Sequence, residues 1–412
     1  MKQKIRNFVL IKMSLKKTIT VLLLFLSISI TAQEKIDSLK EQIDVQDGKM
    51  NAMDDRLTAT ESTLSKLSKI KFSGYVQAQY EDYGADLIKP GASFNSFYIR
   101  RARIKLTYEA TDGVKFVLCP DYSTGNLTLK DAYVVANLPS IKGLALWVGQ
   151  FNRPVYEVEY SSSQREVAER SLVIRNLYPG EREIGAKLEY QPNESPLKIQ
   201  VALLNGNFTG TEAKDIDSRK DLMVRATYSL KIPSQGIGID FGAHAYYGGL
   251  KAQTKYVSGY DGAPDTTYLN KYMDKQWAGA EMQVYFDFLG GMSLKGEYIQ
   301  GKNAYNVVGG GTAATPYKMR NFSGYYAYLI KNIGKKNQAV IRYDYFDPNT
   351  KVSGQNAGSE VYYKTFNFAW QYYLNENIRI TLNYAKPTNE ITQTITKDLS
   401  DDVFTLRFQA KF

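Results

Sequence analysis

The sequence has little of the residues that build disulfides and metal centres. Among 412 residues there is one cysteine, Cys119, and one histidine, His244. A lone cysteine excludes intrachain disulfides and cysteine-rich metal sites. A single histidine removes most histidine-based metal centres and catalytic dyads, and leaves only arrangements built around His244. We therefore expect no metal site, no catalytic residues and no cofactor.

Long hydrophobic runs are also scarce. The mean hydropathy is −0.37, and after residue 32 no apolar run reaches the roughly 18 residues that a membrane-spanning helix needs. The formal net charge of +10 is partly a property of residues 1–32, which hold six bases and no acid. Without them, 46 bases face 42 acids. No basic block or nucleic-acid-binding motif follows, so we expect no nucleic-acid partner.

The N-terminus resembles an export signal. Basic residues precede a short apolar stretch, residues 19–30, and the small Ala32 follows it. This order is typical of a signal peptide, which we place at residues 1–32, with Met1 or Met13 as the first residue. An uncleaved anchor helix is the alternative, but the apolar stretch is short for a bilayer. Export from the cytoplasm is the expected consequence.

Residues 33–69 contain no proline, no aromatic residue and one glycine, Gly48. Larger apolar residues follow a heptad pattern at Ile36, Leu39, Ile43, Met50, Met53, Leu57, Leu64 and Leu67. A narrow apolar stripe on a polar helix indicates self-association, so we predict a periplasmic coiled coil of two or three strands. A solvated amphipathic helix is the alternative. This segment is also a candidate for contact with the cell wall or a periplasmic partner.

From residue 70 onward the pattern changes to short runs in which apolar and polar residues alternate. In the last run, Phe404, Leu406 and Phe408 occupy one face, and Thr405 and Arg407 occupy the other. Sixteen such runs are predicted as strands. Their ranges are 71–81, 96–109, 113–122, 128–137, 143–151, 182–191, 196–206, 219–231, 236–248, 275–288, 291–301, 319–331, 338–347, 360–374, 377–386 and 402–412.

The connections between these runs alternate between long and short, as in outer-membrane barrels. A soluble sandwich, the alternative, has no reason to keep every second turn short. The abundant tyrosines suit interfacial girdles, and the closing Phe412 suits the last strand of an outer-membrane barrel. We therefore predict an all-β fold over residues 70–412: a 16-stranded antiparallel transmembrane β-barrel in the outer membrane, preceded by the short α-helical coiled coil.

A barrel of about 16 strands is too wide for its side chains to fill, so a water-filled channel is the expected function. The connection 152–181 is the longest, and its apolar residues favour folding into the lumen. On the run 96–109, Arg101, Arg103 and Lys105 share the lumen face, with about 7 Å between successive members. Such a ladder offers an anion several weak sites. Pairing of these cations with acids on neighbouring strands remains the alternative.

Several motifs resemble the phosphate-selective porin O and P family. They are FYIRRAR at 97–103, DAYV at 131–134, GQFNRP at 149–154 with Glu157, ERS at 169–171 and EIGA at 183–186. The resemblance covers the chain from about residue 70 to the end. It implies a homotrimer of 16-stranded barrels whose third loop folds inward, with basic residues along the pore. It also assigns Arg153 and Arg170 to the family's third-loop motifs.

The expected anion-binding and pore-lining residues are Arg101, Arg103, Lys105, Arg153, Arg165, Arg170 and Arg175. The connection 152–181 nevertheless has four bases against five acids, so the anion bias read from sequence is mild. The expected solutes are small anions, phosphate or polyphosphate among them. A general diffusion porin of low selectivity and a structural tether or adhesin that uses residues 33–69 are the alternatives. Lipid hydrolysis is disfavoured because His244 faces the lumen.

Overall fold

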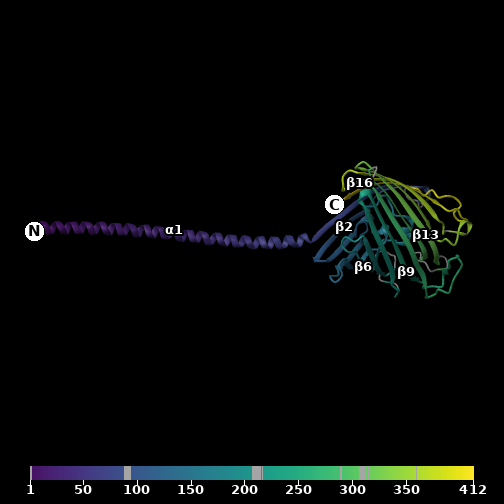
Figure 1. The fold of residues 1–412 in the computed structure, drawn as a ribbon, viewed down its shortest axis with the longest axis horizontal. Helices are drawn as coiled ribbons and strands as arrows, with labels where there is room; N and C mark the ends of the chain where they lie inside the picture. Colours follow the sequence, from purple (N-terminus) through teal and green to yellow (C-terminus); the bar gives the residue numbers. More distant parts are fainter. Residues whose placement is uncertain are drawn as a thin grey trace. The chain divides into compact units, whose positions relative to one another are not determined.

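The computed structural model of the chain describes residues 2–87, 94–206, 215, 217–287, 290–305, 312, 316–358 and 360–412. By its contacts the chain divides into two compact units, Met1–Lys69 and Ile70–Phe412. The first unit is a single helix and the second is built from strands (Figure 1).

The helix α1 spans Lys2–Ser68. Its sequence holds no proline and only Gly48 as a helix-weakening glycine, so nothing interrupts the backbone hydrogen bonding. The heptad residues whose side chains are described are all exposed: Leu39, Ile43, Met50, Met53, Leu57, Leu64 and Leu67. None of the described helices is long and apolar enough to cross a membrane.

The second unit contains sixteen long strands and one two-residue strand within the described ranges. The strands are β1 (Ile70–Tyr83), β2 (Asn95–Thr111), β3 (Val114–Asp121), β4 (Thr128–Asn137), β5 (Leu144–Asn152), β6 (Arg182–Tyr190), β7 (Leu197–Leu204), β8 (Asp221–Ile232), β9 (Ile237–Lys251), β10 (Val257–Ser258), β11 (Tyr272–Phe286), β12 (Met292–Tyr305), β13 (Tyr317–Ile333), β14 (Asn337–Asp347), β15 (Tyr363–Tyr373), β16 (Ile378–Asn389) and β17 (Val403–Lys411). Short 3₁₀ turns lie at η1 (Ala85–Leu87), η2 (Ser123–Gly125), η3 (Pro233–Gln235) and η5 (Gly354–Asn356).

The sixteen long strands pair antiparallel with their neighbours in chain order, and β1 closes the barrel against β17. At this seam Tyr75 pairs with Lys411, and Gly74 exchanges two backbone hydrogen bonds with Phe412. The predicted 16-stranded antiparallel barrel is confirmed. The sequence reading missed β10, which pairs parallel with the start of β13. Residue 288, the end of the predicted strand 275–288, lies outside the described residues.

Alternation along the strands separates an apolar exterior from a polar interior. In β17, Phe404, Leu406 and Phe408 are exposed, whereas Arg407 and Gln409 are buried. This distribution of apolar and polar residues is the reverse of that in a soluble protein. Lipid solvates the apolar outer face, and packing inside the barrel buries much of the polar inner face. The side chains that can act on a solute are therefore the polar ones on the inner face.

Candidate functional site

Residues 153–181, called L3 below, connect β5 to β6 and lie inside the barrel. L3 carries two short helices, α2 (Tyr156–Glu159) and α3 (Leu172–Leu177). Its Ser162 hydroxyl lies 2.7 Å from the Tyr75 hydroxyl of β1. The Glu166 carbonyl accepts a 2.6 Å hydrogen bond from Gln371 Nε2 of β15. Contacts to such separated strands confirm that this connection folds inward.

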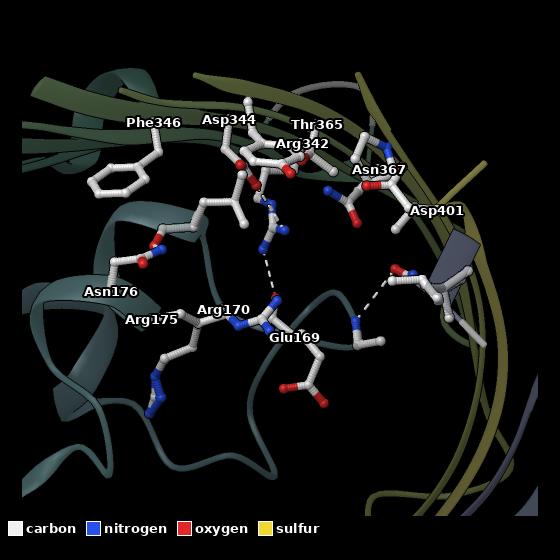
Figure 2. Close-up of a pocket in the computed structure, with 18 of the residues that line it drawn as sticks. Glu169, Arg170, Arg175, Asn176, Arg342, Asp344, Phe346, Thr365, Asn367 and Asp401 are labelled. Carbon is white, nitrogen blue, oxygen red and sulfur yellow. Dashed lines mark hydrogen bonds and ion pairs between the residues drawn. The ribbon is translucent and has the colours of Figure 1, made fainter. Parts of the chain in front are cut away.

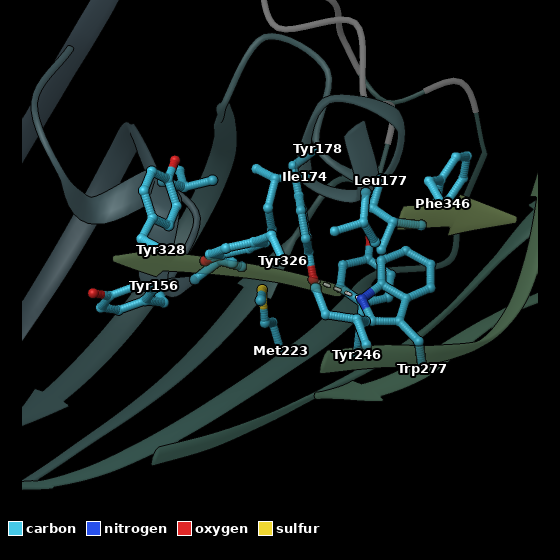
Figure 3. Close-up of a cluster of buried hydrophobic side chains, with 14 of the residues drawn as sticks. Tyr156, Ile174, Leu177, Tyr178, Met223, Tyr246, Trp277, Tyr326, Tyr328 and Phe346 are labelled. Atoms are coloured by element: carbon cyan, nitrogen blue, oxygen red, sulfur yellow. Dashed lines mark hydrogen bonds between the residues drawn. The ribbon is translucent and has the colours of Figure 1, made fainter. Parts of the chain in front are cut away.

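An apolar cluster holds L3 against one side of the wall (Figure 3). Ile174 and Leu177 of α3 are almost fully buried, as is Tyr178. Trp277 Nε1 of β11 donates a 2.6 Å hydrogen bond to the Tyr178 hydroxyl, and the Trp277 ring stacks on Tyr246 with centroids 4.2 Å apart. The apolar residues that predicted inward folding thus form the anchor of the loop.

Opposite this anchor, four guanidinium groups surround one L3 carboxylate, Glu169. Arg100 of β2 binds it bidentately, with Nε and Nη2 each 3.0 Å from a carboxylate oxygen. Arg407 of β17 lies 3.4 Å away, Arg165 of L3 3.6 Å and Arg101 of β2 3.8 Å. We call Arg100, Arg101, Arg165 and Arg407 the arginine cluster.

The arginine cluster fixes the charge of Glu169. Burial opposes ionisation of this carboxyl, but the guanidinium groups, Arg101 and Arg100 foremost, outweigh burial and hold its pKa well below the usual range. Glu169 is therefore an anion at any pH at which the barrel works. One negative charge among four positive ones leaves the surroundings of Glu169 electropositive.

A β-bulge places two adjacent arginines of β2 on the same side. Gln77 of β1 pairs with Arg101, while the next residue, Ala78, pairs with Ile99, so Arg100 is the extra residue. A bulge re-aims side chains that strict alternation would send to opposite faces. Arg100 therefore reaches Glu169 in the lumen, although alternation assigns it to the lipid face.

A second carboxylate, Glu181 at the end of L3, collects three more ion pairs. Arg165 Nη2 lies 2.6 Å and Arg170 Nη1 2.9 Å from Glu181 Oε1, and Arg182 Nη1 lies 2.5 Å from Oε2. Burial opposes ionisation of Glu181, but these cations keep its pKa well below the ordinary value. Burial and the neighbouring Arg165 lower the pKa of Arg170 to about 10, which leaves it charged at neutral pH.

A cavity of about 570 Å³ opens beside L3 (Figure 2). Glu169 and Arg175 reach it from L3, and Arg342, Asp344 and Asp401 line it from the wall side. Arg175 is exposed, and its guanidinium forms no hydrogen bond or ion pair with the described residues; only its backbone N–H donates, to the Ser171 carbonyl at 3.0 Å. Its guanidinium is therefore open to the cavity.

The remaining predicted residues, Arg103, Arg153 and Lys105, differ in their burial and in their ion pairs. Arg103 is buried and binds Asp121 at 2.7 Å and the Ser162 hydroxyl at 2.8 Å. Arg153 is fully buried, and its Nη2 lies 2.7 Å from Glu183. Lys105 is half-buried further along β2. Arg103 thus follows the alternative in which cations pair with acids on neighbouring strands.

The glutamates of L3 also form hydrogen bonds and ion pairs, so the excess of acids over bases in the loop does not by itself give the charge that a solute meets. Glu157 accepts hydrogen bonds from Ser171 and from the Tyr328 hydroxyl. The others form ion pairs: Glu159 with Arg225 and Lys198, Glu166 with Lys295, Glu169 with the arginine cluster, and Glu181 with Arg165, Arg170 and Arg182. The acids of L3 are therefore engaged within the protein, although Glu169 also lines the cavity.

Sequence reasoning missed several residues that the fold brings to this site. Arg407 was visible on the polar face of the last strand, but nothing in the sequence placed it next to Arg101, some 300 positions away along the chain. Arg342 of β14 donates a 2.6 Å hydrogen bond to the Glu169 carbonyl. Closure of the barrel, which joins β17 to β1, is what completes the arginine cluster.

A closed barrel with a lipid-type exterior, a polar lumen and a loop folded across that lumen defines the class of outer-membrane porins, which are channels. Residues 70–412 match the family described as phosphate-selective porin O and P, and the chain belongs to that family. No curated protein matches it.

Solved structures with the same fold include several outer-membrane proteins. OprB of Pseudomonas putida has a TM-score of 0.58 at 11% identity, over 85% of this chain and 96% of that one. An anion-selective porin from Comamonas acidovorans has a TM-score of 0.55 at 11% identity, over 83% of this chain and 99% of that one. The channel DcaP of Acinetobacter baumannii has a TM-score of 0.53 at 13% identity, over 83% of this chain and 97% of that one. At these identities the likeness establishes the fold alone.

Proposed function

We propose that the barrel is a passive channel for small anions, phosphate or polyphosphate among them. The observation that carries the proposal is the arginine cluster: four guanidinium groups face one carboxylate beside the cavity. Guanidinium groups bind carboxylate and phosphate oxygens in the same bidentate geometry that Arg100 makes with Glu169. Glu169, which the cluster surrounds, lines the cavity, so an arriving anion meets the net positive charge of the cluster there.

The ion pairing of L3 strengthens this reading. Its acids are neutralised within the protein, whereas Arg175 stays exposed in the cavity. A lumen in which the loop carboxylates are paired and the Arg175 guanidinium is open attracts anions and weakens cation entry.

The test is the reversal potential of the purified protein in a planar bilayer under a KCl gradient, repeated while phosphate is added. We expect chloride preference and a phosphate-dependent decrease in current. Arg100→Gln combined with Arg175→Gln should reduce both effects. Lys142→Gln, which removes one charge from an exposed turn, is the control that should leave them unchanged.

Other outcomes point elsewhere. Conductance with weak selectivity and no phosphate effect would favour a general diffusion porin. Absence of conductance would overturn the channel proposal and favour a structural tether or adhesin that uses residues 33–69. Cation preference would contradict the role assigned to the arginine cluster.

We also propose that residues 1–32 are removed on export and that residues 33–69 form a periplasmic coiled coil joining barrels into a homotrimer in the outer membrane. The exposed heptad residues, such as Leu57 and Leu64, support this because an apolar stripe on an isolated helix needs a partner. Chemical cross-linking in membranes should trap trimers. Leu57→Lys with Leu64→Lys should reduce the trimer yield, and unchanged yield would contradict the coiled-coil role.

A further inference from the structure

The single histidine lies in a buried cluster on the lumen wall, outside the arginine cluster. His244 of β9, Glu281 of β11 and Glu297 of β12 project inward from three neighbouring strands of the sheet, and their candidate ligand atoms lie within 4.8 Å of one another. The side chains of His244 and Glu297 are completely inaccessible to solvent. The cluster is therefore held by strands and not by a mobile loop.

Polar atoms in this cluster lack partners. Neither ring nitrogen of His244 has a hydrogen-bond partner among the described residues, and Glu297 Oε1 has none either. His244 Nδ1 and Glu297 Oε1 lie 3.4 Å apart. Buried polar groups without partners are costly, so such atoms in one place point to a missing ligand.

The fixed charge around the cluster favours a cation. Three carboxylates, Glu159, Glu281 and Glu297, meet here, and Arg225 bridges the first two. Among the described residues, the Glu297 side chain accepts one hydrogen bond, from the Tyr326 hydroxyl to Oε2 at 2.7 Å. Glu297 therefore has no cation of its own among the described residues, while its Oε1 points toward the imidazole.

The spacing of His244 and Glu297 suits a transition-metal ion. Zinc binds imidazole nitrogen and carboxylate oxygen at about 2.0–2.2 Å, which places tetrahedral ligands about 3.4 Å apart. This is the separation of His244 Nδ1 from Glu297 Oε1. Glu281 can supply a third oxygen while keeping Arg225, because a carboxylate offers about four lone-pair positions.

The backbone opposite the histidine is adapted to it. Gly279 of β11 pairs with His244 across the sheet, and a Cβ at Gly279 would lie 2.4 Å from the His244 Cε1 atom. Only glycine leaves room for the ring in this position. The ring is thereby fixed against β11, next to the two carboxylates.

We propose that His244, Glu281 and Glu297 form a binding site for a divalent transition-metal ion of the zinc type. The ion fixes β9, β11 and β12 behind L3, since Arg225 also holds Glu159 of α2. The role is structural, and it is independent of which solute passes through the lumen.

The test is equilibrium dialysis of the full-length folded protein against ZnCl₂ after treatment with a chelator, with bound zinc measured by mass spectrometry. We expect one tightly bound zinc ion per chain. Glu297→Gln should weaken binding at least about tenfold, as should His244→Ala, because each loses a ligand. Glu189→Gln removes a half-buried carboxylate on β6 of the same wall and should keep wild-type binding.

A measurement of folding distinguishes loss of the zinc ligand from loss of the fold. Glu297→Gln retains a side-chain oxygen that can accept the hydrogen bond from Tyr326. The folded barrel can be verified by its heat-dependent migration on gels. Zinc should raise the thermal unfolding midpoint of the wild type but not of Glu297→Gln. Absence of stoichiometric zinc in the folded wild type would overturn the proposal, as would binding unaffected by both Glu297→Gln and His244→Ala.

Discussion

The arginines of this porin fall into two groups that differ in exposure. Arg153 is fully buried against Glu183, and its guanidinium lies 5.9 Å from the Tyr178 ring. Arg175 is exposed in the cavity. The first group supports the fold of L3, and the second acts on the field in the lumen.

Substitution of these two residues should separate stability from selectivity. Arg153→Gln breaks the buried ion pair with Glu183, and breaking a buried pair by removing one partner costs about 3–5 kcal/mol of unfolding free energy. Arg175→Gln should leave stability within about 0.5 kcal/mol and lower chloride preference. Denaturant unfolding of the reconstituted protein and reversal potentials measure the two effects. Equal stability of the two variants would contradict this division.

Glu169 limits the positive potential of the arginine cluster. One unit charge acting over 4 Å in water contributes about 1 kcal/mol, which corresponds to about a fivefold change in local anion occupancy. Glu169→Gln should therefore increase chloride preference and strengthen phosphate block. Glu194→Gln, in an exposed turn, makes the same change in net charge and serves as the control. A loss of anion preference in Glu169→Gln would show that Glu169 chiefly orders the arginines.

At the scale of elements, L3 is held by close packing between α3 and the wall. A Cβ at Gly324 of β13 would lie 2.7 Å from Val173 Cβ of α3. Gly324 thus permits α3 to approach the sheet.

Gly324→Val should push α3 away from the wall. Overpacking of this kind costs about 1–3 kcal/mol, and the displaced loop should change single-channel conductance and increase its noise. Ala327→Val, an exposed position on the outer face of the same strand, should change neither. Wild-type conductance in Gly324→Val would mean that the loop shifts without altering the channel.

The strands were predictable because each carries a local pattern, and every predicted range overlaps one of the sixteen long strands. The bulge at Arg100 was not, because alternation predicts a side-chain direction only where pairing is regular. The inward course of L3 followed from its apolar residues. Its partners, such as Trp277, depend on register across the whole barrel and have no local signature.

At the scale of the molecule, the acidic residues near the outer end of β17 give the lumen a response to pH. Burial raises the pKa of Asp401 to about 6, and the neighbouring carboxylates of Asp398, Asp402 and Asp86 add to the effect. Asp401 also lines the cavity. Above pH 6 it is an anion at the cavity wall, and below pH 6 it is neutral.

Chloride preference should therefore rise as the pH falls from 7 to 5. Asp401→Asn should reduce this step and raise the chloride preference at pH 7. Glu169 should contribute no step, because its pKa lies far below this range. Reversal potentials at the two pH values measure the effect, and an unchanged step in Asp401→Asn would assign it to another group.

Whole-chain charge was a poor guide to the lumen. The barrel region holds 40 bases against 34 acids, which indicated only a mild anion bias. The structure distributes these charges unevenly: the L3 acids are paired inside the protein, whereas Arg175 is open to the cavity. Net charge predicts the sign of the field, but placement decides its strength where a solute passes.

The seam between β1 and β17 also determines the order of assembly. Tyr75 meets Lys411 there, so the ring closes only after the last strand has been made. Until then β1 presents an unpaired edge, which invites pairing with other chains. The long sequence separation makes closure a slow, late event. Between export and closure the chain therefore has to be kept from aggregating by something other than its own fold.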